Sequence, residues 1–222
     1  MFEELNKLFE SVTIRPTFDI VHVILALILF AKNPDGIGRY KLKKSLLIGS
    51  GTARSLVNKL KEKTNFIKLA ENNKRKGHIL TEKGLEFLKK VKKKIPILAE
   101  GDPQFLEEII IEKEKYETYF CLVKNAAEQL SSGIEQRDAA IKVNGSGATC
   151  LMYNGSELRF PASSSSQNNE ELKISEKVQK YFKTKITDYN AELEKDDVII
   201  IGFGKDFETA RLATLNSALT LI

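Results

Sequence analysis

The side chains best suited to contact another molecule lie between Gly51 and Lys63. Apolar residues recur there at the spacing i, i+3, i+4 and i+7, which predicts a helix with one buried stripe. The stripe consists of Ala53, Leu56, Val57 and Leu60. Around it stand side chains that donate or accept hydrogen bonds, namely Thr52, Arg54, Ser55, Asn58 and Lys59, with no acidic residue before Glu62. Side chains of these types read base edges and bind phosphates, so the segment predicts a helix that contacts nucleic acid.

Further cations flank this helix in the sequence. Residues 39–46 predict a short helix that buries Leu42 and Leu46, and we expect its Arg39 and Lys43 to contact nucleic acid as well. Residues 71–77 form a polar loop between two predicted strands, 66–69 and 78–80. The loop carries Lys74, Arg75 and Lys76, which we expect to touch a neighbouring backbone or the minor groove.

These elements follow one another in the order typical of a winged helix-turn-helix. A tight turn at 47–50 containing Gly49 separates the two helices, the two strands and their basic loop form the wing, and a helix opens at Thr81. The strand, basic loop and strand followed by the letters LTEKG are the more specific part, because a helix-turn-helix alone is a weak signal. Two more helices are predicted ahead of it, at 2–12 and at 18–32, the second apolar on nearly every face.

Charge divides the chain into a basic and an acidic half. Residues 1–94 contain 21 Lys and Arg against 9 Asp and Glu, a balance of +12, whereas residues 95–222 have a balance of −7. A basic surface gains binding free energy by releasing counterions from phosphates, so we expect double-stranded DNA as the partner. Two alternatives stay open. Winged helices also bind RNA or proteins, and lysine-rich surfaces are often only solvated.

The acidic half predicts an α+β domain at 108–222. A linker at 95–107, which contains prolines and a glycine, joins it to the winged helix-turn-helix domain at 1–94. We expect that first domain to be mainly α with a β-wing. Strands are predicted at 108–112, 118–123, 148–153, 157–160 and 197–203. Helices are predicted at 134–140, 170–186 and 207–221. Asn154-Gly155 is a strong hairpin signal. We expect a mostly antiparallel sheet with helices packed on one face.

Two places in this half are candidate ligand sites. Gly202 and Gly204, between a buried strand and a helix, resemble a truncated phosphate-binding loop, although Asp206 at the helix start opposes a phosphate and favours an ordinary capped turn. Arg137 and Asp138 are the second candidate, with a surface ion pair as the alternative.

The residue types that serve catalysis and metal binding do not cluster in this sequence. Both histidines, His22 and His78, lie in the basic half without a neighbouring cysteine, so we expect no metal site, no cofactor and no enzyme. Cys121 and Cys150 are expected as buried strand thiols.

Five segments taken in order resemble a small archaeal family of two-domain proteins of unknown function. They are LLIGSGTARSLVNKL (46–60), KGHILTEKG (76–84), IEQRDAAIK (134–142), GATCLMYNGSELRFP (147–161) and DVIIIGFGKDFETARLATLNSAL (197–219). The resemblance implies an N-terminal winged helix and a C-terminal domain similar to the GAD-like α+β domains inserted in some aminoacyl-tRNA synthetases and amidotransferases. It implies no activity and no catalytic residues.

The sequence therefore predicts a DNA-binding transcription regulator, expected as a cytoplasmic homodimer whose acidic domain senses a small-molecule effector or holds the dimer. An RNA- or ribonucleoprotein-associated adaptor using the same basic surface is the alternative. An enzyme would be motivated only by the turn at 202–206. The most apolar run, residues 20–31, is too short for a bilayer span of roughly twenty residues.

Overall fold

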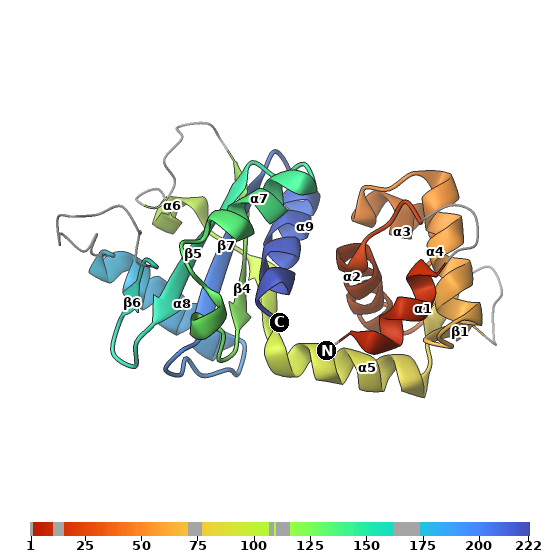
Figure 1. The fold of residues 1–222 in the computed structure, drawn as a ribbon, viewed down its shortest axis with the longest axis horizontal. Coiled ribbons are helices and arrows are strands. Elements are labelled where there is room, and N and C mark those ends of the chain that lie inside the picture. The colour runs from red at the N-terminus through yellow and green to blue at the C-terminus, as the bar shows by residue number, and fades with distance from the viewer. Residues whose placement is uncertain (1, 11–15, 71–76, 107–108, 110–115, 162–173) are drawn as a thin grey trace. The chain divides into compact units, whose positions relative to one another are not determined.

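The computed structural model describes residues 2–10, 16–70, 77–106, 109, 116–161 and 174–222. The chain divides into two compact units, residues 1–91 and 92–222. The first unit is helical with a two-stranded sheet, and the second is built on a five-stranded sheet (Figure 1). The protein is thus of the α+β class, as the sequence predicts.

Helices and one small sheet make up the first unit. Its elements are η1 (Glu3–Leu5), α1 (Asn6–Phe9), α2 (Ile20–Ala31), α3 (Arg39–Leu46), α4 (Ser50–Glu62), β1 (Ile67–Leu69), β2 (His78–Leu80) and α5 (Glu82–Lys94), whose last three residues fall in the second unit. Strands β1 and β2 pair antiparallel with Lys68 opposite Ile79. Helix α2 buries nine of its twelve residues, which explains its nearly continuous apolar sequence.

Asp19 and His22 fix the start of α2. The Asp19 carboxylate accepts the backbone N–H of His22, and His22 Nδ1 accepts the Asp19 N–H at 3.0 Å. This reciprocal pair is a capping box with Asp19 as the N-cap. His22 is buried, and its Nδ1 accepts a hydrogen bond, which requires the neutral form of the ring.

The stability of the first unit should fall as the solution is acidified. Burial lowers the pKa of His22 from 6.5, with the Asp19 carboxylate opposing the shift. The unfolded chain therefore binds a proton more readily, so this contribution is complete above about pH 6.5 and is lost as the pH falls from there through the folded pKa. Urea unfolding at several pH values measures it. His22→Gln cannot titrate and should show a smaller pH dependence; an unchanged dependence contradicts this role.

The second unit is built around one antiparallel sheet with strand order β3-β4-β7-β5-β6. The strands are β3 (Ile97–Glu100), β4 (Glu117–Val123), β5 (Gly147–Tyr153), β6 (Leu158–Arg159) and β7 (Val198–Gly204). The remaining elements are α6 (Pro103–Leu106), η3 (Ala127–Gln129), α7 (Ile134–Lys142), α8 (Glu176–Asp188), α9 (Phe207–Ala218) and η4 (Leu219–Leu221). Central strand β7 is buried along its whole length.

The edge strand β3 corrects the predicted linker at 95–107. Ile97 and Ala99 are buried, and β3 pairs with β4, with Ile97 opposite Leu122. The prolines around this short segment hide its alternating pattern. The predicted strand 108–112 lies outside the described residues except for Ile109, which is buried in a turn.

Helices cover both faces of the sheet, whereas the sequence predicts them on one face (Figure 1). On one face α8 packs against β4, with the rings of Phe120 and Phe182 5.5 Å apart. On the other, α9 binds β7 through the Gly202 N–H, which donates to Thr214 Oγ1 at 3.1 Å, and α7 packs against α9. Because neighbouring residues of a strand point to opposite faces, strands as apolar as β4 and β7 need cover on both sides.

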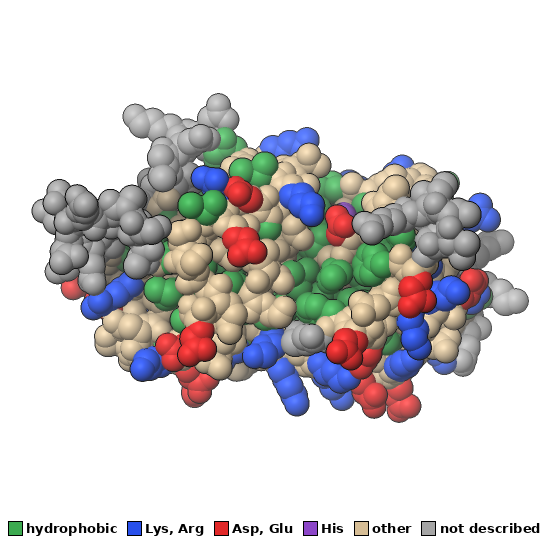
Figure 2. Space-filling view, viewed as in Figure 1, with side chains coloured by type: hydrophobic (Ala, Val, Ile, Leu, Met, Phe, Trp, Pro, Cys, Tyr) green, Lys and Arg blue, Asp and Glu red, His purple; other side chains and the backbone are tan. Residues whose placement is uncertain are grey.

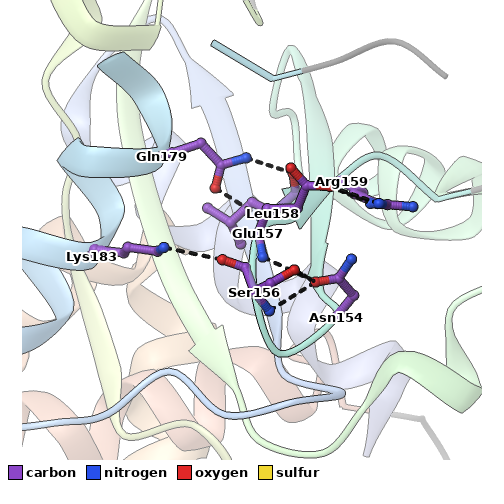
Figure 3. A network of polar contacts seen from close by, with 7 residues as sticks. All are labelled: Asn154, Ser156, Glu157, Leu158, Arg159, Gln179 and Lys183. Atoms are coloured by element: carbon purple, nitrogen blue, oxygen red, sulfur yellow. Dashed lines mark hydrogen bonds and ion pairs between the residues drawn. The ribbon is translucent and has the colours of Figure 1, made fainter. Parts of the chain in front are cut away.

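The hairpin of β5 and β6 forms where Asn154-Gly155 predicts it (Figure 3). Asn154 Oδ1 accepts the backbone N–H groups of Ser156 and Glu157, and Gly155 takes a positive φ of 101°. On the far side of β6, the Gln179 amide accepts the Leu158 N–H and donates to the Leu158 carbonyl, both at 2.8 Å. A side chain of α8 therefore satisfies the edge of β6 that another strand could otherwise pair with.

Candidate nucleic-acid interface

Helices α3 and α4 and the turn between them form as the sequence predicts. Helix α3 buries Leu42 and Leu46, and α4 buries the full stripe of Ala53, Leu56, Val57 and Leu60. Leu47 ends α3 in the left-handed region with φ 55°, and Gly49 precedes α4. Packing of these leucines and small residues sets the position of the polar faces of both helices.

A groove of about 110 Å³ lies between the first turns of α3 and α4. We call it the α3–α4 groove; its lining residues are Arg39, Tyr40, Lys43, Ser50 and Ala53. The structure brings Arg39 and Lys43 together with the N-terminal turn of α4. Among the described residues, no side chain caps the backbone of that turn. Two cations, a hydroxyl and the positive end of a helix make the groove favourable for an anionic group.

Tyr40 is the residue that sequence reasoning missed. Tyr40 is 87% exposed, and it lines the α3–α4 groove together with Arg39 and Lys43. Its position on α3 could have indicated its exposure. Leu42 and Leu46 mark the buried side of the helix, and Tyr40 does not lie on that side. An aromatic ring held in water beside cations is typical of a binding surface rather than of a core.

Three of the α4 side chains predicted to contact nucleic acid lie on the outer face of the helix. Arg54 and Asn58 are exposed and Ser55 is half-buried, along the side opposite the buried stripe. Each has a side chain able to hydrogen-bond base edges.

Thr52 and Lys59, at the flank of that face, have contacts within the chain, and their predicted contact with nucleic acid stays a prediction. Thr52 Oγ1 lies 2.7 Å from Thr17 Oγ1. Lys59 Nζ donates to the carbonyl oxygens of Leu8 at 2.6 Å and Glu10 at 3.2 Å, where it caps the end of α1. Their polar groups hold the N-terminal segment against α4. The remaining predicted contacts, Lys74, Arg75 and Lys76, lie outside the described residues.

The glycine candidates of the second unit, Gly202 and Gly204, lie where α9 packs closely against β7. A Cβ on Gly202 would lie 2.6 Å from Thr214 N, and one on Gly204 2.5 Å from Ala210 N, so both glycines allow α9 to approach β7. Asp206 Oδ1 accepts the Thr209 N–H at 2.8 Å, and hydrogen bonding by Thr209 lowers the pKa of Asp206. A carboxylate that already caps the helix leaves no cradle for a phosphate.

The other candidate pair is an ion pair on the surface of α7. Arg137 Nη2 lies 2.8 Å from Asp138 Oδ1, with both side chains more than half exposed. Cys121 and Cys150 are free and buried as expected, and burial raises the pKa of Cys150 to about 12. In the described part of the chain, no group of three or more His, Cys, Asp or Glu could hold a metal ion. Nor does any helix in that part combine the length and apolar composition needed to cross a bilayer.

Comparison with known proteins gives two matches, neither of which carries a function. A family model described as a domain of unknown function (DUF4443) matches residues 115–221. A solved structure, "Hypothetical protein PH0730 from Pyrococcus horikoshii OT3", is similar with a TM-score of 0.63 and 25% sequence identity, covering 92% of this chain and 93% of that chain. No curated protein matches. These findings support the resemblance to archaeal proteins of unknown function; the winged-helix and GAD-like details of that resemblance stay predictions.

Proposed function

We propose that the first unit is a winged helix-turn-helix that binds double-stranded DNA, and that the chain acts as a cytoplasmic transcription regulator. The observation that carries this proposal is the shared surface of α3 and α4, where Arg39 and Lys43 line one groove and Arg54 is exposed on the adjoining helix. The order α3, turn, α4, β1, β2, α5 supports it, because a short helix, a second helix and a two-stranded wing place the second helix in the major groove.

In this proposal the groove and the face of α4 have different tasks. The α3–α4 groove holds a backbone phosphate, which positions the module without reading sequence. Arg54 and Asn58 on the exposed face of α4 contact base edges, and the cations 74–76 contact the neighbouring backbone. The acidic second unit then senses an effector or holds two copies together.

Binding of the full chain to a random duplex and to a structured RNA, measured by fluorescence anisotropy at physiological salt, tests this function. We expect the duplex to bind more tightly. Clear preference for the RNA would replace the proposal with the RNA-associated adaptor, and binding of neither would leave no support for a nucleic-acid partner.

Selection of bound sequences from a random duplex library tests the task of α4. Arg54→Ala should lose discrimination at one base position by about 1–3 kcal/mol. Lys89→Ala removes the same charge from the exposed surface of α5 and should leave the selected sequence unchanged. Equal effects of the two variants contradict base readout by Arg54.

A further inference from the structure

Helix α7 turns a stripe of apolar and charged side chains toward solvent. Ile134 and Ile141 are 54% and 52% exposed, and Arg137 and Asp138 stand exposed between them. These four residues, at i, i+3, i+4 and i+7, occupy one side of the helix, and we call them the α7 stripe. Over α7 the visible face of the second unit carries hydrophobic, basic and acidic side chains close together (Figure 2).

The opposite side of α7 is already occupied within the chain. Gln136 is buried and donates to Thr220 Oγ1 at 2.7 Å, and its carbonyl accepts the Ser217 hydroxyl at 2.7 Å. Asn216 Nδ2 donates to the Ala139 carbonyl at 2.7 Å. Helix α7 is therefore fixed to α9 and η4, and its α7 stripe is a rigid surface.

The order of residues in the α7 stripe is self-complementary. Read in either direction it runs apolar, charged, charged, apolar, and reversal exchanges Arg137 with Asp138. If two copies of α7 pack antiparallel about a two-fold axis midway between these two residues, Ile134 of each copy faces Ile141 of the other. Arg137 of each then faces Asp138 of the other. A two-fold interface requires a surface that is complementary to itself in this way.

We propose that the α7 stripe is a self-association surface and that its occupant is α7 of a second copy of this chain. The intrachain pair of Arg137 and Asp138 does not oppose this arrangement. An exposed ion pair contributes little to stability. In the dimer both residues join a four-charge cluster, and part of the isoleucine surface is removed from water. This association is independent of the DNA-binding proposal.

The size of the stripe sets the strength of the association. One nine-residue helix from each copy buries less than the roughly 1,200–2,000 Å² of a standard stable interface. The dimer is therefore weak, with a dissociation constant on the order of micromolar or higher. A DNA site that binds two copies side by side would add to such a weak contact.

Sedimentation velocity of the full chain between about 1 and 500 µM tests the proposal by charge reversal. Wild type should shift from monomer to dimer across this range. Arg137→Asp and Asp138→Arg each place like charges opposite one another and should raise the dissociation constant at least about tenfold. An equimolar mixture of the two variants should dimerise again, because each then meets a partner of opposite charge. Glu157→Arg, on the exposed hairpin, is the matched control and should behave as wild type.

Three results would overturn the proposal: wild type that stays monomeric throughout, single variants that dimerise as wild type does, or a mixture no better than its components. Thermal unfolding shows whether a charge variant folds. If one does not, Ile141→Lys, at an exposed position, carries the same test, and its dimerisation at wild-type concentrations overturns the proposal equally.

Discussion

The double variant Arg39→Ser/Lys43→Ser is expected to bind duplex DNA about tenfold more weakly than wild type at about 0.1 M salt. Both side chains line the α3–α4 groove, where we place a backbone phosphate. Each cation that neutralises a phosphate releases condensed counterions, and the affinity gained is about tenfold per neutralised phosphate between 1 M and 0.1 M salt. Titration of a labelled duplex with each protein measures the difference.

A matched control lies on the same helix. Lys41 and Lys44 are exposed on α3 but do not line the groove, and Lys41 Nζ donates to Asn33 Oδ1 at 3.0 Å. Lys41→Ser/Lys44→Ser removes the same charge from the same helix and should weaken binding only a few-fold. Equal losses in the two double variants would mean that overall charge, and not the α3–α4 groove, determines binding.

Asp197→Ala is expected to lower the free energy of unfolding of the second unit by about 3–5 kcal/mol. Asp197 is 1% exposed, and its carboxylate accepts Lys124 Nζ at 2.7 Å and the backbone N–H groups of Asn125 at 3.0 Å and Glu194 at 2.8 Å. Truncation leaves the backbone N–H groups of Asn125 and Glu194 without this acceptor, and each unsatisfied buried group costs its desolvation free energy. Lys124 keeps the Glu194 carboxylate at 2.6 Å and adds less to the loss. The hydrogen bonds of Asp197 therefore link the turn before β7 to the end of β4.

Chemical denaturation followed by circular dichroism measures this change. Glu157→Ala breaks an exposed ion pair with Arg159 and should change the free energy of unfolding by about 1 kcal/mol or less. A change of similar size in both variants would contradict the structural role of Asp197.

Local pattern was enough to predict the helices of the interface. The stripe of Ala53, Leu56, Val57 and Leu60 fixes which side of α4 is buried, and the spacing of Leu42 and Leu46 does the same for α3. These two patterns also place four side chains away from the buried side of their helix: Arg39, Lys43, Arg54 and Asn58. The same reasoning applies to the Asn154-Gly155 hairpin.

The contacts of Thr52 and Lys59 could not be read in this way. Their partners, Thr17 and the carbonyls of Leu8 and Glu10, lie 35 or more residues away in the chain. Residue type and helical spacing place both side chains beside the buried stripe, but only the tertiary fold shows that another segment covers that flank. Tyr40 shows the opposite. An aromatic residue is usually expected to be buried, but the packing of α3 leaves Tyr40 exposed.

Glycine and strand signals in the second unit were ambiguous for a related reason. Gly202 and Gly204 allow close approach of a backbone, and the sequence does not distinguish an approaching phosphate from an approaching helix. Here α9 approaches. Strand β3 is only four residues long, and its pairing with β4 rather than its sequence makes it a strand.

The salt dependence of duplex binding tests the central claim, that the cations of α3 and α4 neutralise DNA phosphates, most directly. Between about 50 and 200 mM salt, the logarithm of the wild-type association constant should fall linearly with the logarithm of salt. Arg39→Ser/Lys43→Ser should show a slope shallower by about 0.9, for the one phosphate that the variant no longer neutralises. A wild-type affinity that does not change with salt, or a variant with the wild-type slope, would contradict the account.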